Sequence, residues 1–230
     1  MILHFFKRNA KAITTIIMLL SAMPTNSQTI VDSSKAQASK ADAEIEKKAS
    51  EWTAALQLND EVKSQKIHDA ILTHLKAVRD WHNEHPSSLV PAGINPATGN
   101  KLSELDRQVI ICSTKPISIH QNLMNQLKAQ LDSTQLSLIL DKYTVGKVAF
   151  TLGGYKSIVT DLTATEEAEI LKNLRQAREQ AIDYKSMKEI SAIFEIYKTK
   201  CEQYLNNNGR NWRQLYKSYS DKIKAQKQKA

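Results

Sequence analysis

Apolar residues recur at helical spacing along most of the chain. In the first such segment, Ala49 and Trp52 lie on one stripe, which is typical of an amphipathic helix. A second stripe follows Asn59 or Asp60, either of which suits an N-cap, and ends before Pro86. The chain has neither hairpin signals nor the alternation of strands and helices that makes a parallel sheet. The pattern therefore predicts an all-α protein, a single-domain bundle of about six to eight helices.

Helix boundaries are clearest in the second half of the chain. Asp132 with Gln135, and Thr163 with Glu166, have the spacing of a capping box, in which each side chain bonds to the other residue's backbone. Gly146 predicts a bend between these two starts. The helices expected in this region cover 101–131 with a kink or break at Pro116, 133–143, a short one broken near Gly153–Gly154, 164–184 and 186–207, and a last one begins near Asn211.

The first 27 residues have the composition of a signal peptide. Lys7, Arg8 and Lys11 precede an apolar run over 12–23, which is shorter than the roughly 20 residues of a membrane span. We expect cleavage near Ser27 and a periplasmic or secreted protein; an uncleaved membrane anchor is the alternative. No later segment is apolar enough to cross a membrane. The expected organisation is a signal peptide (1–27), a flexible leader (28–37), a helical domain (38–216) and a basic helical tail (217–230).

The positive charge gathers at the C-terminal end. The net charge is +8, and seven basic residues from Arg210 onward face only one acidic residue, Asp221. An exported protein is not expected to bind nucleic acid. The candidate partners of this tail are an anionic polysaccharide or an anionic membrane surface, and the alternative is a helix end that is simply solvated.

Few residues have the spacing of a disulfide or a metal-binding site. Cys112 and Cys201 form either one disulfide or two buried free thiols, since export places them in an oxidising compartment. His74, His82 and His85 could hold zinc but equally suit a helix C-terminus, so we predict no metal site.

The sequence offers three tryptophans as aromatic platforms and no enzyme signature. Trp52 falls on a core stripe and Trp81 is ambiguous, whereas Trp212 is the tryptophan expected to be exposed and able to stack on a sugar. No paired carboxylates, nucleophile elbow, phosphate loop or cofactor fingerprint is found. We therefore expect no cofactor and favour a binding protein over an enzyme; a lyase or hydrolase of uronate polymers would need an acid–base pair.

The segment 127–219 carries a series of short motifs at consistent spacing. Their residues are Leu131, Gln135, Asp141, Thr144, Gly146, Val148, Thr151, Gly154, Tyr155, Asp161, Leu162, Thr163, Ala177, Arg178, Glu179, Ala181, Ile182, Phe194, Tyr197, Lys198, Lys200, Tyr204 and Leu205. In these motifs the chain resembles the bacterial family catalogued as domain of unknown function 3826, which is described as sugar-binding and found in secreted proteins of polysaccharide-degrading bacteria. The chain departs from the family at Ile190, Ser191 and Ile193, where Lys-His and Trp are usual, so a ligand contacted there would differ or be lost.

The resemblance implies a carbohydrate-associated protein in polysaccharide use, with an oligo- or polysaccharide as its ligand. A cleft of Asp, Tyr, Arg and Lys side chains would suit hydroxyl-rich or acidic (uronate) sugars. If the helices 164–184 and 186–207 pack antiparallel, Arg178 would face Tyr197 and Lys198 across the hairpin. The same polar residues could instead form a structural ion-pair network, and two similar Leu-Thr-x-x-Gln-like helix starts also resemble small periplasmic chaperones. The candidate ligand-binding residues are Asp141, Thr144, Tyr155, Arg178, Tyr197 and Lys198.

Overall fold

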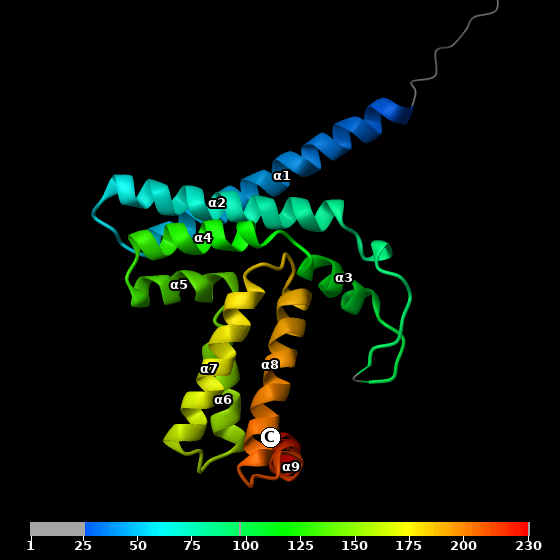
Figure 1. Cartoon of the computed structure of the whole chain (residues 1–230), viewed down its shortest axis with the longest axis vertical. Coiled ribbons are helices and arrows are strands. Elements are labelled where there is room, and N and C mark those ends of the chain that lie inside the picture. Colours follow the sequence, from blue (N-terminus) through cyan, green and yellow to red (C-terminus); the bar gives the residue numbers. More distant parts are fainter. Residues whose placement is uncertain (1–25, 97, 230) are drawn as a thin grey trace, which may run out of the picture. The chain divides into compact units, whose positions relative to one another are not determined.

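The computed structural model describes residues 26–96 and 98–229, with side chains from residue 37 to 228 (Figure 1). The chain divides into two units, 1–40 and 41–230, and the packing described below is that of the second unit. The predicted signal peptide lies, apart from its last two residues, outside the described residues.

The described residues form nine α-helices, one short 3₁₀ turn and no β-strand, which confirms the all-α prediction. The number of helices exceeds the expected six to eight because the segment 101–131 is divided in two. The elements are α1 (Asn26–Ala54), α2 (Glu61–Glu84), the turn Ser87–Leu89, α3 (Glu104–Ser113), α4 (Ile117–Gln130), α5 (Ser133–Tyr143), α6 (Lys147–Ile158), α7 (Ala164–Ala181), α8 (Met187–Asn207) and α9 (Trp212–Lys229).

The capping signals read from the sequence set the helix starts. The backbone N–H of Gln135 donates to Asp132 at 2.8 Å, and that of Glu166 donates to Thr163 at 3.2 Å, with the reciprocal bond present in both boxes. Pro116 separates α3 from α4, since proline cannot donate to the preceding turn. Gly146 has φ +66°, a left-handed conformation that glycine adopts without strain, and α6 begins there.

The extents of two helices differ from those predicted from the sequence. The structure continues α1 back to Asn26, through the stretch 28–37 assigned to a flexible leader. The break expected at Gly153–Gly154 is wrong, because α6 runs unbroken from Lys147 to Ile158. Two glycines weaken a helix by about 1 kcal/mol each relative to alanine, and burial of Val148 and Tyr155 on either side of them offsets this cost.

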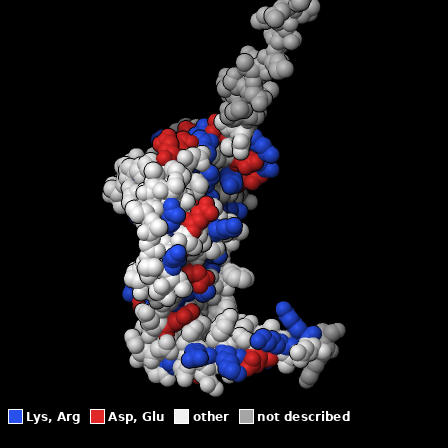
Figure 2. All heavy atoms as spheres, turned by 90° about the vertical axis from the view of Figure 1, so that its right-hand side faces the viewer, with Lys and Arg blue, Asp and Glu red and all other residues white. Residues whose placement is uncertain are grey.

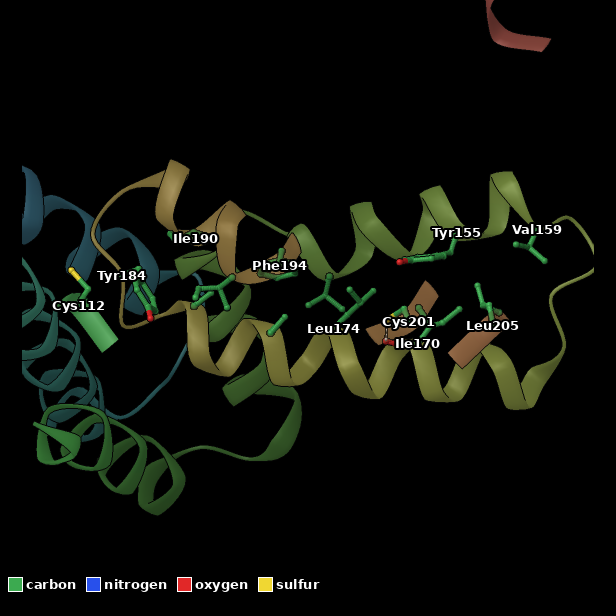
Figure 3. Packing of buried hydrophobic residues seen from close by; sticks show 14 residues of the cluster. Cys112, Tyr155, Val159, Ile170, Leu174, Tyr184, Ile190, Phe194, Cys201 and Leu205 are labelled. Atoms are coloured by element: carbon green, nitrogen blue, oxygen red, sulfur yellow. Dashed lines mark hydrogen bonds between the residues drawn. The ribbon is translucent and has the colours of Figure 1, made fainter. Parts of the chain in front are cut away.

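Two hydrophobic clusters make up the core of the 41–230 unit. The first joins α6, α7 and α8, and Figure 3 shows its members in a row from Tyr184 and Ile190 through Phe194 to Leu205. Helices α7 and α8 lie side by side as an antiparallel hairpin (Figure 1). The second cluster joins α1, α2, α4 and α5, and it includes Ile182 from the end of α7. The turn between α7 and α8 therefore lies where the two clusters meet.

Asp183 in that turn is held by residues from three other parts of the chain. His74 of α2 donates through Nε2 to Oδ1 at 2.9 Å, and His120 of α4 donates through Nδ1 to Oδ2 at 3.0 Å. The Lys115 ammonium donates to the Asp183 carbonyl at 2.9 Å. Burial alone would raise the pKa of Asp183, but the two histidine hydrogen bonds lower it well below its usual range. We call Asp183, His74, His120 and Lys115 the Asp183 hub.

The two histidines of the hub differ in charge. Burial lowers the pKa of His74, which is therefore neutral at physiological pH. The hydrogen bond to Asp183 raises the pKa of His120, which favours the imidazolium. A similar contact lies about two turns further along α2, where His82 Nε2 is 2.9 Å from Glu189 Oε1. The other Glu189 oxygen accepts from the Lys185 and Ser186 backbone N–H groups, so α2 also contacts the start of α8.

We expect Asp183→Asn to lower the free energy of unfolding by about 3 kcal/mol, because it removes the charged partner of a largely buried ion pair.

The pKa of His120 is raised in the folded state, so the charged imidazole stabilises that state. This stabilisation is complete below about pH 6.5 and is lost as the pH rises through the folded-state pKa. The stability deficit of His120→Gln should therefore be larger at pH 6 than at pH 9. Urea unfolding followed by circular dichroism measures both deficits.

The lowered pKa of His74 makes the folded state less stable at low pH, which is the opposite pH dependence. Because His74 is present in both the wild type and His120→Gln, its effect cancels to first order when their stabilities are compared. The control is His120→Gln made in the Asp183→Asn background, where the deficit should be small and independent of pH. A deficit that stays constant from pH 6 to 9 in the wild-type background would contradict the assigned pair.

Candidate functional site

A pocket of about 260 Å³ lies between α6, α8 and α9. Three aromatic side chains line it together with one basic and one acidic residue, which is the mixture of flat apolar surface and polar groups found in many ligand pockets. We call it the aromatic pocket. Its lining residues are Tyr155, Ile158, Lys198, Glu202, Trp212 and Tyr216.

The aromatic rings form a row. The Trp212 ring centroid lies 5.1 Å from that of Tyr155 and 6.0 Å from that of Tyr216. Tyr155 is buried and donates its hydroxyl to the Lys198 carbonyl at 3.1 Å, whereas Tyr216 is 53% exposed. The row therefore runs from the core to the surface, with the partly exposed Trp212 in the middle.

The charged groups of the aromatic pocket stand in different environments. Lys198 Nζ is 2.9 Å from Glu195, its neighbour one turn back on α8. Burial raises the pKa of the Glu202 carboxyl. Burial also raises the pKa of the Tyr155 hydroxyl far above its usual value, so this group remains a hydrogen-bond donor. The pocket thus offers an ammonium and a carboxyl beside the aromatic row.

Arg210 fixes the position at which α9 leaves α8. Its Nε and Nη2 donate to the two carboxylate oxygens of Glu166 at 2.9 Å each, and its Nη1 donates to Asp161 at 2.7 and 2.8 Å. These bonds lower the pKa of Glu166 to about 2. The backbone N–H of Trp212 then donates to Asn206 Oδ1 at 3.0 Å, so the start of α9 is held against α8.

A second pocket, of about 550 Å³, lies between α4, α5 and α7. Arg178 is its most buried charged residue, with a side chain 9% exposed. Its Nη1 donates to Ser137 Oγ and to Asp141 Oδ1, both at 2.8 Å. We call it the arginine pocket. Its lining residues are Met124, Lys128, Ser133, Thr134, Leu136, Ser137, Leu140, Arg175, Arg178 and Glu179.

The six candidate residues do not form one site. Tyr155 and Lys198 line the aromatic pocket, while Arg178 lines the arginine pocket and pairs with Asp141. The expectation that Arg178 faces Tyr197 and Lys198 is wrong. The antiparallel hairpin is present, but Arg178 is on the side of α7 that packs against α5 rather than α8.

The other two candidates do not line either pocket. Thr144 is fully buried and donates its hydroxyl to the Leu140 carbonyl at 3.3 Å. It therefore completes the end of α5 and does not reach a ligand. Tyr197 packs against the first core cluster, and Lys200 Nζ lies 4.1 Å from its ring centroid.

The remaining chemical candidates have structural roles. Cys112 and Cys201 are separate, buried free thiols, and burial raises the pKa of both, that of Cys201 to about 11. The histidines considered for zinc contact other groups: His74 binds Asp183, His82 binds Glu189, and the His85 ring stacks on Trp81. Among the described residues, no group of three or more His, Cys, Asp or Glu side chains could hold a metal ion.

Sequence reasoning missed four residues of the pockets that bear on function. Glu202 and Tyr216 follow Lys198 and Trp212 at a spacing of four, which places each pair on one helix face. Arg175 precedes Arg178 by three, and Lys128 lies on α4. The helical spacing could have suggested the first three, but no signal in the sequence brings α4 next to α7.

In the described residues, the fold and its pockets define an all-helical protein with a pocket lined by aromatic side chains. The chain belongs to the family described as "Protein of unknown function (DUF3826)", whose model matches residues 42–225. The match covers nearly all of the 41–230 unit. No curated protein matches the chain. In the described part of the chain, no helix combines the length and the apolar character needed to cross a membrane.

We expect Arg210→Gln to release the start of α9 without unfolding the α7–α8 hairpin. Arg210 lies in the turn between α8 and α9, and its ion pairs with Asp161 and Glu166 hold this turn against the start of α7. Hydrogen exchange at neutral pH should become roughly tenfold faster at the amides of 210–216. The matched control is Arg213→Gln, since Arg213 is exposed and makes no ion pair with a described residue. Unchanged exchange in Arg210→Gln would show that apolar packing alone positions α9.

Proposed function

We propose that this protein binds carbohydrate and that a sugar ring lies against Trp212 in the aromatic pocket. The observation that carries the proposal is the row of Tyr155, Trp212 and Tyr216 beside Lys198 and Glu202. The apolar C–H face of a pyranose packs on an aromatic ring. Its hydroxyl groups pair with charged side chains, which form stronger hydrogen bonds than neutral groups do.

The size of the aromatic pocket suits a small part of a glycan. Its volume of about 260 Å³ lies just below the roughly 300–1,000 Å³ of pockets that enclose drug-sized ligands. One sugar unit of a longer chain would fill it while the neighbouring units extend into solvent. A binding protein for oligo- or polysaccharide needs neither a cofactor nor a catalytic pair.

The proposed setting is the periplasm or the exterior of the cell. It rests on the signal-peptide pattern of the first 27 residues and on the resemblance to secreted proteins of polysaccharide-degrading bacteria. The basic side chains of α9, visible in Figure 2, have only Asp221 as an acidic neighbour on the same helix. These positive charges on α9 would favour an acidic glycan over a neutral one through long-range electrostatic attraction.

A helical chaperone is the second candidate function. A groove between α3 and α8 exposes Leu105, Met187 and Ile196, with Met187 45% and Ile196 49% exposed. Exposed apolar patches of this kind can bind unfolded chains. Suppression of aggregation of a reduced, unfolded client, lost in Ile196→Asp and retained in Tyr216→Ala, would favour the chaperone over the sugar-binding protein.

We expect a subset of oligosaccharides to raise the melting temperature of the chain, because a ligand that binds only the folded state stabilises it by mass action. Tyr216→Ala and Trp212→Ala should weaken binding of the same sugar by about tenfold in isothermal calorimetry, the equivalent of about 1.4 kcal/mol. Glu202→Gln tests the polar contact without removing an aromatic ring.

The matched control is Phe150→Ala, which removes an aromatic ring that is 82% exposed and lies outside the aromatic pocket. It should bind the sugar as the wild type does. Trp212 also packs on the core, so Tyr216→Ala is the decisive variant if Trp212→Ala unfolds. A flat response to neutral and acidic sugars alike would exclude the proposal.

A further inference from the structure

We infer that the arginine pocket is a second ligand site, which binds the carboxylate of a uronate sugar through Arg178. The carboxylate part of this inference stands on the geometry of the pocket, and the sugar part rests on the proposed function. The site is separate from the aromatic pocket, since the two share no lining residue.

The hydrogen bonds that the Arg178 side chain makes to described residues all come from one of its three guanidinium nitrogens, Nη1. Nη1 makes hydrogen bonds to Ser137 and Asp141. Nε, although buried, has no hydrogen-bond partner among the described residues, and none of them accepts from Nη2. The N–H bonds of Nε and Nη2 point the same way and match the two oxygens of a carboxylate. A buried N–H group without a partner is costly, so a ligand that pairs with this edge would recover the loss.

The surroundings of Arg178 favour an anion. Arg175 and Lys128 line the same pocket, are exposed, and make no ion pair with any residue that the structure describes. Asp141 balances Arg178, which leaves Glu179 as the acidic residue in the pocket lining. The Glu179 carboxylate is turned towards His120, with 3.7 Å between Oε1 and Nε2. Arg175 and Lys128 thus form an uncompensated cationic rim.

The other polar groups of the pocket suit a hydroxylated ligand. Ser133, Thr134 and Ser137 place three hydroxyls along one side of α5. Ser133 and Thr134 belong to the first turn of this helix, whose backbone N–H groups favour negative charge. A planar guanidinium edge, a cationic rim and hydroxyl groups match a carboxylate attached to a sugar ring. The volume of about 550 Å³ leaves room for more than an isolated ion.

The test is isothermal calorimetry on the full mature chain with three probes: trigalacturonate, its neutral counterpart galactotriose, and inorganic phosphate. Trigalacturonate should bind more tightly than galactotriose. Arg175→Gln and Arg178→Lys should each weaken its binding by about tenfold, because Lys keeps the charge of Arg178 but lacks the planar edge. Both variants should leave galactotriose binding unchanged. Lys66→Gln removes the charge of an exposed lysine of α2 that lies outside both pockets and outside α9; it is the matched control and should bind as the wild type does.

Arg175 is exposed, so Arg175→Gln tests the inference even if Arg178→Lys fails to fold. Wild-type affinity for trigalacturonate in Arg175→Gln, or no binding of trigalacturonate to the wild type, overturns the inference. Phosphate that binds as tightly as trigalacturonate and competes with it also overturns it, because the pocket would then be a general anion site. If trigalacturonate binding is weakened only by Tyr216→Ala, the aromatic pocket holds the uronate: the proposed function survives and this inference fails.

Discussion

The architecture depends on one carboxylate, that of Asp183 in the turn between α7 and α8. His74, His120 and Lys115 reach this turn from the α2 and α4 side of the core. The interaction lies where the two hydrophobic clusters meet, and Ile182 beside it belongs to the cluster formed by α1, α2, α4 and α5 rather than to that of its own hairpin. Because a buried carboxylate without partners is strongly unfavourable, the hub also determines which ends of the helices can meet.

The aromatic pocket and the arginine pocket each depend on one helix, and in each case the ion pairs of an arginine fix the position of that helix. Arg210 binds Glu166 and Asp161, so that α9 starts beside α6 and brings Trp212 next to Tyr155. Arg178 binds Asp141 and Ser137, so that α7 lies along α5 with a hydroxyl-rich cavity beside them. In both cases the ion pair first positions a helix, and the pocket results from that placement. The structural and the ligand-binding interpretations of Asp141 and Arg178 are therefore compatible.

The candidate site shows where sequence reasoning was sufficient and where it was not. Three of the predicted ligand-binding residues, Tyr155, Lys198 and Arg178, line a pocket, and their binding of a ligand stays a prediction. Thr144 was misleading: a threonine at a helix end often bonds to a carbonyl of its own last turn, as this one does. The pairing of Arg178 across the hairpin was wrong, since antiparallel packing fixes direction but not the rotation of each helix about its axis.

The sequence by itself determined the helices and most of their ends. Periodicity, the capping boxes at Asp132 and Thr163, Pro116 and Gly146 act within a few residues, so local chemistry is enough to predict them. Only the tertiary structure decided that Gly153–Gly154 stays helical, that Cys112 and Cys201 remain apart, and that Arg210 clamps α9. These outcomes depend on burial and on charges more than 40 residues apart in the chain, which no local pattern records.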